Sequence, residues 1–320
     1  MDDVGTLANA DMRSVDVFIA DSLASDVTLV SQVSEYIVKS GGKRLRPLIV
    51  LLAARALGYT GSQNIRAAAI IEFIHTATLL HDDVVDGSAM RRGKQSANAV
   101  FGNQASVLVG DFLYSRAFQM MVDLGSMRVM QILADATNTI AAGEVMQLMN
   151  VHDPDTSEEQ YLQVIYRKTA KLFEAGAHIA AVLADRPEQE QLAMLAYGRH
   201  LGTAFQLVDD ALDFDASPEE LGKNLGDDLA EGKATLPLIH AMRHAGTPER
   251  DMIRGAILEG GLEHLGHIQT VIEETGALDY TATRAREAAD LAIESLVGLP
   301  DSPHKQALAV IADFAVRRRS

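Results

Sequence analysis

Three carboxylates lie within five residues in His81-Asp82-Asp83-Val84-Val85-Asp86-Gly87, a stretch that ends a long apolar run. The same pattern returns about 120 residues later in Asp209-Asp210-Ala211-Leu212-Asp213. Carboxylates four residues apart on a helix share a face, and each such pair costs about 0.2–0.5 kcal/mol without a counter-ion. Because divalent cations prefer oxygen ligands, the two copies predict metal binding at two helix ends.

Outward from these motifs, most segments have apolar residues spaced three to four apart and are rich in Ala, Leu, Met and Glu. Strand signals are almost missing, so we predict an all-α fold. The expected helices are 12–24, 26–39, 46–58, 63–86, 104–123, 126–150, 157–184, 188–214, 234–245, 249–259, 263–275, 279–297 and 303–317. The Gly, Pro and Ser breaks between them are too short for linkers, which predicts a single domain over residues 1–320.

The composition excludes several classes of function. The 320 residues are 48% hydrophobic and can bury a large core. The absence of Cys excludes disulfides, thiolate zinc sites and cysteine nucleophiles. A net charge of -16 argues against nucleic acid as a partner. No signal-peptide pattern is present and the longest apolar run, 47–54, is far too short to span a membrane, so we expect a cytoplasmic protein without a transmembrane segment.

Several cations lie near the first aspartate motif in the sequence. A glycine turn opens Gly41-Gly42-Lys43-Arg44-Leu45-Arg46-Pro47, whose cations beside a helix start suit a phosphate. Taken alone, such a basic helix start is more often simply solvent-facing. His75 and Thr78 share a helical face with Asp82 and Asp86. Arg91-Arg92-Gly93 follow, either as part of the same site or as a surface pair that neutralises Asp86.

The second half of the chain repeats this combination. Gln206, Asp209, Asp210 and Asp213 fall at i, i+3, i+4 and i+7, which makes one polar stripe. Lys168-Thr169 interrupts an apolar helical pattern, although one lysine alone is more often a surface residue. Lys223 and Lys233 lie in glycine-rich segments without the spacing of a nucleotide-binding loop. The Met- and Leu-rich stripes at 112–121 and 140–149 are expected to be mainly core.

In their order and number these motifs resemble the trans-isoprenyl diphosphate synthase family, and within it the bacterial long-chain, octaprenyl-type synthases. The resemblance covers essentially the whole chain. It implies an isoprenoid synthase fold with antiparallel helices around a central active-site cavity. It rests on Gly41-Gly42-Lys43-Arg44-Leu45-Arg46-Pro47, Leu79-Leu80-His81-Asp82-Asp83-Val84-Val85-Asp86, Arg91-Arg92-Gly93, Lys168-Thr169, Phe205-Gln206-Leu207-Val208-Asp209-Asp210, Lys223-Asn224 and Gly232-Lys233.

The resemblance implies a prenyltransferase that condenses an allylic diphosphate, such as farnesyl diphosphate, with several molecules of isopentenyl diphosphate. The allylic diphosphate ionises with the help of Mg²⁺, expected as three ions, and the double bond of isopentenyl diphosphate attacks the resulting cation. The implied main metal ligands are Asp82, Asp86 and Asp209. The implied assisting ligands, direct or through water, are Asp83, Asp210 and Asp213.

The resemblance also implies roles for the cations and for two neutral side chains. The residues implied to bind isopentenyl diphosphate are Lys43, Arg46, His75 and Arg92. Those implied to surround the allylic diphosphate are Arg91, Lys168, Thr169, Gln206, Lys223 and Lys233. Among these, the implied catalytic set at the developing cation is Lys168, Thr169 and Gln206.

Chain length is implied by the residues before the first motif. Aromatic side chains at the fifth and fourth positions before its first aspartate stop the product early in this family, and here these positions hold Ala77 and Thr78. Their small size implies a long product of about eight isoprene units growing in an apolar tunnel. Such a product is a precursor of quinone side chains. The family further implies a homodimer. Transient contact with a membrane during release of so apolar a product is left open by the sequence.

Three alternatives remain open at this stage. A class I terpene cyclase uses similar aspartate-metal chemistry but needs only one diphosphate pocket. A non-catalytic helical subunit of a heteromeric prenyl synthase would be expected to lose aspartates or cations. An all-α domain with solvated acidic helix ends would explain one motif better than the whole ordered set.

Overall fold

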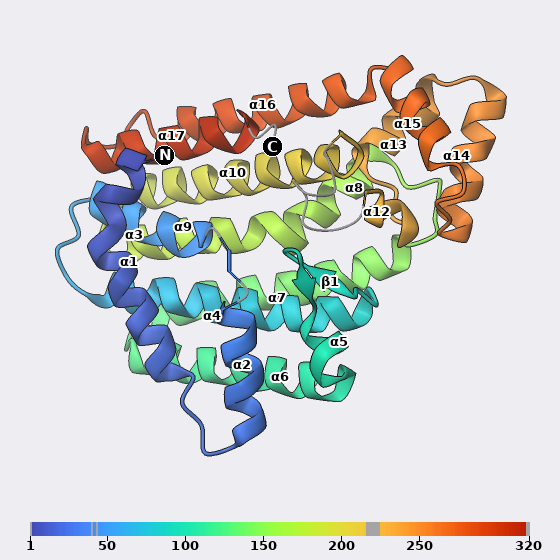
Figure 1. Cartoon of the computed structure of the whole chain (residues 1–320). Coiled ribbons are helices and arrows are strands. Elements are labelled where there is room, and N and C mark those ends of the chain that lie inside the picture. Colours follow the sequence, from blue (N-terminus) through green and yellow to red (C-terminus); the bar gives the residue numbers. More distant parts are fainter. Residues whose placement is uncertain (1, 40, 43, 216–224, 318–320) are drawn as a thin grey trace. The chain divides into compact units, whose positions relative to one another are not determined.

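Helices make up most of the chain in the computed structural model, which describes residues 2–39, 41–42, 44–215 and 225–317 (Figure 1). The predicted all-α class is confirmed. The chain divides into two compact units, each built from separate segments. The first comprises Met1–Thr137, Leu172–Gly198 and Ile293–Ile311, and the second Asn138–Lys171, Arg199–Ala292 and Ala312–Ser320. The single domain expected from the sequence stays a prediction.

The first unit is centred on α4, which packs against α1, α3 and α6. Its own helices are α1 (Asp2–Ser22), α2 (Thr28–Lys39), α3 (Leu45–Ala56), α4 (Gln63–Val85), α5 (Ala97–Phe101) and α6 (Asn103–Asp123). Ile70, Ile71, Ile74 and Leu80 of α4 are fully buried, and each such side chain stabilises the fold by about 1.5–3 kcal/mol. This core fixes the helix that ends in the first aspartate motif.

A short hairpin follows α4 in the same unit. Strands β1 (Met90–Arg91) and β2 (Lys94–Gln95) pair antiparallel. Arg92 and Gly93 form the turn with positive φ angles of 53° and 73°, as a two-residue hairpin turn requires. The hairpin was not predicted, because two-residue strands leave no alternating pattern in the sequence.

The second unit has its core under α13 to α16, where Leu236, Leu238, Ile253, Ile257 and Ile268 are fully buried in one apolar cluster. The helices that lie wholly or partly in this unit are α7 (Met127–Asn150), α8 (Glu158–Ile165), η1 (Tyr166–Ala170), α9 (Lys171–Leu183), α10 (Glu188–Asp215), α12 (Asp227–Ala230), α13 (Leu236–His244), α14 (Thr247–Glu259), α15 (Leu265–Glu274), α16 (Ala277–Ser295) and α17 (Pro303–Arg317).

The short helices α5 and α12 were not expected. The boundaries of the expected helices agree with the structure within a few residues, with two informative exceptions. Helix α1 begins at Asp2 rather than near 12, because Val4 and Ala8 extend its buried face. The expected helix 157–184 is interrupted by a π-helical turn, η1. Helix α8 starts with a capping box between Ser157 and Gln160, the sequence signal that places its first residue.

The prediction that the stripe at 140–149 is core was wrong for its second half. Val145, Leu148 and Met149 are 59%, 62% and 77% exposed, whereas Ile140 is buried. Apolar periodicity shows that a helix has an apolar face but does not show what covers that face. In the part of the chain that the structure describes, every helix is too short or too polar to cross a membrane.

Candidate active site

The first aspartate motif forms the C-terminal end of α4. Asp83 is fully buried, while Asp82 and Asp86 are half-buried. The carboxyl end of a helix carries partial negative charge, so carboxylates there need cations. Arg91 of the hairpin supplies one, because its Nε and Nη2 lie 2.8 and 2.6 Å from Oδ1 of Asp83. Burial opposes the charge of Arg91, but the hydrogen bond and charge of Asp83 outweigh it and raise the pKa of Arg91.

Arg91 therefore holds the middle aspartate of this motif, and Asp82 and Asp86 are its more accessible carboxylates. A further contact fixes the segment between helix and hairpin. The amide of Asn98 donates to the carbonyl oxygens of Asp83 (3.0 Å) and Ser88 (3.2 Å). The geometry joins Arg91 to the motif through Asp83, and the charges of Asp82 and Asp86 also act on Arg91.

A second group of predicted residues lies around His75, which is on α4 one to two turns before the first aspartate motif. Nη1 of Arg46 lies 3.1 Å from Nε2 of His75. Since arginine only donates, this nitrogen of His75 is the acceptor and the ring is neutral. Burial, followed by the charges of Arg46 and Arg92, lowers the pKa of His75 well below its ordinary value. The guanidinium of Arg46 also lies over the Phe173 ring, 4.4 Å from its centroid.

Arg92 approaches the glycine turn before α3. A Cβ on Gly42 would lie 2.5 Å from Nη1 of Arg92, and Gly42 has a φ of 144°. The positive φ favours glycine at this position, and a side chain here would also displace the end of Arg92. The guanidinium of Arg92 thus lies close to the backbone of this turn. Lys43 lies outside the described residues.

Glu72 lies among these cations and was not predicted from the sequence. Its Oε1 lies 3.9 Å from Nη1 of Arg44. Burial raises the pKa of Glu72, against the charges of Arg44, Arg46 and Arg92. The available signal was its position three residues before His75, which puts both on one helical face.

The two chain-length positions lie on α4 between His75 and the motif. Ala77 is fully buried. Thr78 is half-buried, and its hydroxyl donates to the carbonyl oxygen of His75 at 2.8 Å. Both side chains are as small as the sequence shows, and their part in chain length stays a prediction.

The second motif ends α10 and lies in the second unit. Asp210 and Asp213 are buried, and Asp209 is half-buried. The hydroxyl of Tyr161 donates to Oδ2 of Asp210 at 2.5 Å, and the amide of Gln206 donates to Oδ1 at 2.7 Å. The hydroxyl of Thr169 donates to Oε1 of Gln206 at 2.8 Å. The structure thus joins Thr169, Gln206 and Asp210 in one hydrogen-bond chain.

Tyr161, which ends this chain, was missed because it stands 49 residues before Asp210 with no pattern to connect them. Burial and the charges of Asp228 and Asp209 raise the pKa of Asp210 to about 8, against the hydrogen bonds from Tyr161 and Gln206. The hydrogen bonds from these neutral donors therefore do not offset the combined effect of burial and of the neighbouring carboxylates on Asp210.

Asp228 is the second missed residue here, although it is visible in the sequence as part of Gly226-Asp227-Asp228. The backbone N–H of Asp228 donates to Oδ2 of Asp213 at 3.2 Å, and the N–H of Gly226 donates to the carbonyl oxygen of Asp213 at 2.9 Å. Asp213 therefore anchors the start of α12 to the end of α10. This contact brings a further carboxylate close to the second motif.

Lys168 and Thr169 lie in η1, the π-helical turn between α8 and α9. Such turns are rare and occur frequently at functional sites. The ammonium of Lys168 lies 2.8 Å from Oε2 of Glu144 and 2.6 Å from Oε1 of Gln147. Lys168 is therefore a half-buried, fixed cation rather than a mobile surface lysine.

Lys233 is the one of the two remaining predicted cations that the structure describes. Lys233 forms an ion pair with Glu231, and its backbone N–H donates to the carbonyl oxygen of Asp228 at 2.8 Å. Lys233 thus lies in the same segment as the acidic start of α12. Lys223 lies outside the described residues.

These residues suit magnesium. Among the described residues, no three His, Asp or Glu side chains already form a closed metal cage. Mg²⁺ does not need one, because it keeps several waters and binds through one or two carboxylates together with substrate phosphates. Burial and the charges of Asp228 and Asp209 raise the pKa of Asp210, and a divalent cation would offset those charges.

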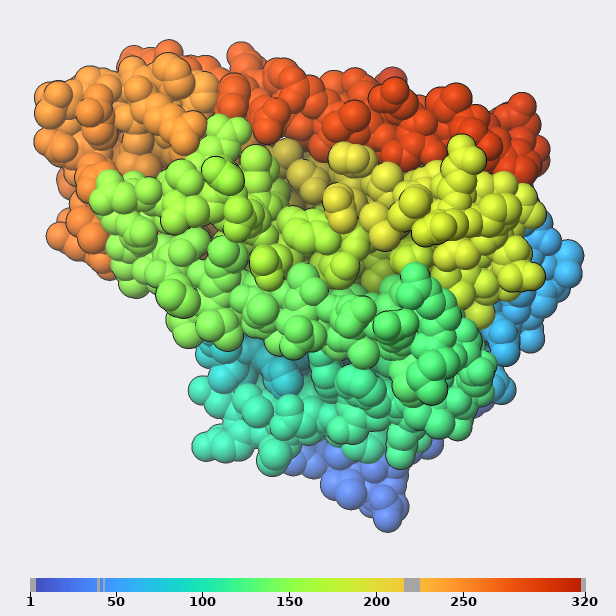
Figure 2. Space-filling view, turned by 180° about the vertical axis from the view of Figure 1, so that it is seen from behind, coloured from blue at the N-terminus to red at the C-terminus, as the bar shows by residue number. Residues whose placement is uncertain are grey.

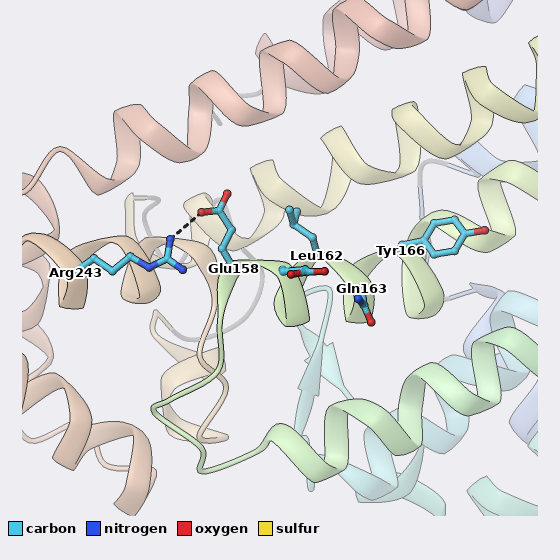
Figure 3. A pocket seen from close by; sticks show the side chains of 6 residues that line it. Glu158, Leu162, Gln163, Tyr166 and Arg243 are labelled. Atoms are coloured by element: carbon cyan, nitrogen blue, oxygen red, sulfur yellow. Dashed lines mark hydrogen bonds and ion pairs between the residues drawn. The ribbon is translucent and has the colours of Figure 1, made fainter.

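A hollow on the second unit has a different set of lining residues. It is lined by Glu158, Glu159, Leu162, Gln163, Tyr166 and Arg243 (Figure 3). The carboxylate of Glu158 is already paired with Arg243 at 3.0 Å and accepts from the hydroxyl of Tyr280 at 3.0 Å. None of the predicted site residues lines this hollow, so we do not assign the site to it.

Comparisons with known proteins agree with the motifs. The model of the polyprenyl synthetase family matches residues 27–275. The octaprenyl diphosphate synthase of Escherichia coli strain K12 is 56% identical over 99% of both chains. The all-trans-nonaprenyl-diphosphate synthase (geranyl-diphosphate specific) of Rhodobacter capsulatus is 47% identical over 96% of this chain and 95% of the relative. A crystal structure of a polyprenyl synthase from Caulobacter crescentus CB15, complexed with calcium and isoprenyl diphosphate, has a TM-score of 0.97 and 46% identity, covering 100% of this chain and 98% of that one.

Proposed function

The chain belongs to the polyprenyl synthetase family and is a prenyltransferase, and on this basis we propose that it makes octaprenyl diphosphate for a quinone side chain. The observation that supports this product most directly is the 56% identity to an octaprenyl diphosphate synthase over 99% of both chains. The substrates are an allylic diphosphate, such as farnesyl diphosphate, and several molecules of isopentenyl diphosphate.

We propose that Asp82, Asp86 and Asp209 hold the Mg²⁺ ions, expected as three, on the allylic diphosphate. The metal, when bound, supplies positive charge that stabilises the leaving diphosphate. Arg91 already occupies Oδ1 of Asp83, and Tyr161 and Gln206 donate to the two oxygens of Asp210, so these two aspartates orient the motifs or act through water. Asp213, which accepts from the N–H of Asp228, positions the α12 carboxylates.

The cations complete the allylic site in this proposal. Lys168, Arg91, Lys223 and Lys233 bind the diphosphate oxygens as the allylic carbon–oxygen bond breaks. The oxygen atoms of Thr169 and Gln206 stabilise the cation that forms. The double bond of isopentenyl diphosphate then forms a carbon–carbon bond to that carbon, and the proton lost from the adduct passes to the departed diphosphate.

Isopentenyl diphosphate binds to the cationic group on the first unit in this proposal. Arg46, Arg92 and Lys43 bind its phosphate oxygens, because a guanidinium can donate two parallel hydrogen bonds to phosphate. The neutral ring of His75 accepts from Arg46 and fixes the direction of that guanidinium. A terpene cyclase would have no use for this second set of cations, and the comparisons do not favour that alternative.

The direct test is mass spectrometry of the product that the purified chain makes from farnesyl and isopentenyl diphosphates with Mg²⁺. We expect octaprenyl diphosphate, and no turnover in the presence of a chelator. A cyclic hydrocarbon formed without isopentenyl diphosphate would contradict the proposal. Activity that appears only after a second polypeptide is added would favour the non-catalytic subunit.

Chain length can be tested separately at Thr78. We expect Thr78→Phe to shift the product to shorter polyprenyl diphosphates, because an aromatic ring next to buried Ala77 fills space that the growing tail needs. Thr270→Phe, on an exposed position of α15, is the matched control and should leave the product unchanged. An unchanged product in Thr78→Phe would show that this part of α4 does not line the tunnel.

We further propose a cytoplasmic homodimer. The exposed apolar residues of α7, Val145, Leu148 and Met149, support this proposal, because apolar patches of this kind mark protein interfaces. The residues of α7, coloured green, lie on the face turned to the viewer in Figure 2. Light scattering should give a dimer for the native chain and a monomer for Leu148→Glu, and a monomer for both would contradict this proposal.

Membrane contact is expected only when the long apolar product leaves. Flotation with phospholipid vesicles should recover the enzyme in the lipid fraction after turnover and not before it. Recovery that is equal with and without product would contradict this expectation.

A further inference from the structure

Two side chains of α7 hold the ammonium of Lys168. Oε2 of Glu144 lies 2.8 Å and Oε1 of Gln147 lies 2.6 Å from Nζ. Glu144 and Gln147 are three residues apart on one helix and therefore share a face. Lys168 and Glu144 are only 21% and 29% exposed, so this contact is much less screened by water than a surface ion pair.

The backbone around Lys168 is built to keep this contact. The π-turn η1 sets the direction of Lys168, and Gly143 lets that turn lie directly on α7. A Cβ on Gly143 would lie 2.7 Å from Cβ of Arg167 and 2.9 Å from the backbone nitrogen of Lys168. Helix α7 thus presents a glycine for the close approach and, on the next residues, two oxygen acceptors for the lysine.

We propose that Glu144 and Gln147 are positioning residues that fix the Lys168 ammonium for the allylic diphosphate. This inference rests on the proposed function, in which Lys168 binds that diphosphate. An ammonium has three N–H donors; the two acceptors on α7 take two of them and leave one for a phosphate oxygen. Without them, the flexible four-carbon stem of lysine would have to be ordered during each turnover.

The proposal assigns different parts to the two acceptors. The carboxylate of Glu144 balances the charge of Lys168 while no substrate is bound, and the neutral amide of Gln147 adds direction. Because fixed donors stabilise developing charge better than mobile ones, loss of the carboxylate should slow ionisation of the primer. Binding of isopentenyl diphosphate, assigned to Arg46, Arg92 and His75, should not change.

The test is a double-mutant cycle of Glu144→Gln, Lys168→Met and their combination. Turnover is measured with farnesyl and isopentenyl diphosphates varied in turn. We expect Glu144→Gln to lower kcat/KM for farnesyl diphosphate about tenfold, with the KM for isopentenyl diphosphate unchanged within about twofold. Lys168→Met should lower kcat/KM for farnesyl diphosphate about a hundredfold. The double variant should have the same kcat/KM as Lys168→Met, because the effects of residues that act through one another are not additive.

Two further variants separate positioning from general damage. Glu159→Gln is the matched control, since Glu159 is exposed on α8 in the same unit, and it should behave like the native enzyme. The exchange Glu144→Gln with Gln147→Glu moves the carboxylate one turn along α7. It should recover most of the activity, and a loss of packing alone would not be repaired by this exchange.

The outcomes distinguish the inference from the proposed function. If Glu144→Gln lowers kcat/KM equally with and without Lys168, Glu144 does not act through Lys168 and the inference is overturned alone. A failure of the exchange variant to recover activity, with a native thermal unfolding curve, would overturn it as well. If Lys168→Met keeps native kcat/KM, the role of Lys168 in the proposed function fails, and the inference fails with it.

Discussion

The two aspartate motifs share one sequence pattern but have opposite electrostatic surroundings. In the first, the buried middle residue Asp83 is paired with the guanidinium of Arg91 at 2.6 Å. In the second, the buried middle residue Asp210 has only the neutral donors Tyr161 and Gln206, with Asp228 nearby. The middle carboxylate is therefore paired with a cation in the first motif, whereas in the second motif it accepts from neutral donors and has a further carboxylate nearby. We infer that the second motif depends more strongly on bound cations.

The outer aspartates should give the largest effects. We expect Asp82→Ala and Asp209→Ala each to lower kcat about a thousandfold or more, because each removes a ligand of the cations that stabilise the leaving group. Steady-state kinetics at saturating Mg²⁺ checks this. Equal activity in either variant and the native enzyme would show that this motif does not bind the catalytic metal.

Substitutions of the two middle aspartates, Asp83 and Asp210, should differ in their effect on the free energy of unfolding and not only on the rate. Asp83→Asn leaves the charge of Arg91 without its partner and should cost about 2–3 kcal/mol of unfolding free energy. Asp210→Asn should cost less than about 1 kcal/mol at pH 7 without metal, because the raised pKa already makes this carboxyl neutral. Urea unfolding of the metal-free proteins measures both values. Equal losses of unfolding free energy in the two variants would contradict the electrostatic difference between the motifs.

The pH dependence of stability should also separate the two regions. His75 has a lowered pKa in the folded state, so its contribution is present above about pH 6.5 and is lost as the pH falls. Asp210 has a raised pKa of about 8, so its contribution is present below about pH 4 and is lost as the pH rises toward 8. Each slope is at most about 1.4 kcal/mol per pH unit.

Two variants check these slopes in metal-free unfolding measurements. His75→Gln keeps a neutral acceptor for Arg46 and should flatten the acid side of the stability curve. Asp210→Asn should flatten the side between pH 4 and 8. A native curve in either variant would show that another group causes the corresponding slope.

The smallest expected effect is that of Tyr161. Tyr161→Phe removes one hydrogen bond to Asp210 and should cost about 1 kcal/mol, as a neutral hydrogen bond does. The matched comparison is Tyr197→Phe, where the lost bond goes to the carbonyl oxygen of Leu308. Similar losses in unfolding free energy would show that Tyr161 acts only in stability. A larger loss of kcat in Tyr161→Phe alone would show that it orients the motif.

Local patterns were sufficient for much of the fold and for part of the site. The expected helix 63–86 is α4, Gln63–Val85, because apolar spacing reports the helical period directly. The spacing of His75 and Asp82 likewise placed them on one helix. The roles of these residues in binding substrate or metal stay predictions, since they came from family resemblance.

Local sequence patterns could not predict contacts between segments that are distant in the sequence. Tyr161 and Asp210 are 49 residues apart in sequence, and Lys168 and Glu144 belong to different helices. The exposed side of α7 was expected to be core because its apolar spacing is the same whether the face is covered or not. Lys168, which taken alone is more often a surface residue, gains its fixed position only from Glu144 and Gln147.

The sequence by itself determined that this chain is helical and that two aspartate motifs end two of its helices, because helical periodicity and spacing are local properties. Only the tertiary structure decided which of the two middle carboxylates is paired with a cation. That difference comes from burial and from the partners Arg91, Tyr161 and Asp228, which long-range packing brings to Asp83 and Asp210. Charge interactions depend on distance and solvent exposure, and neither quantity is written in the spacing of residues along the chain.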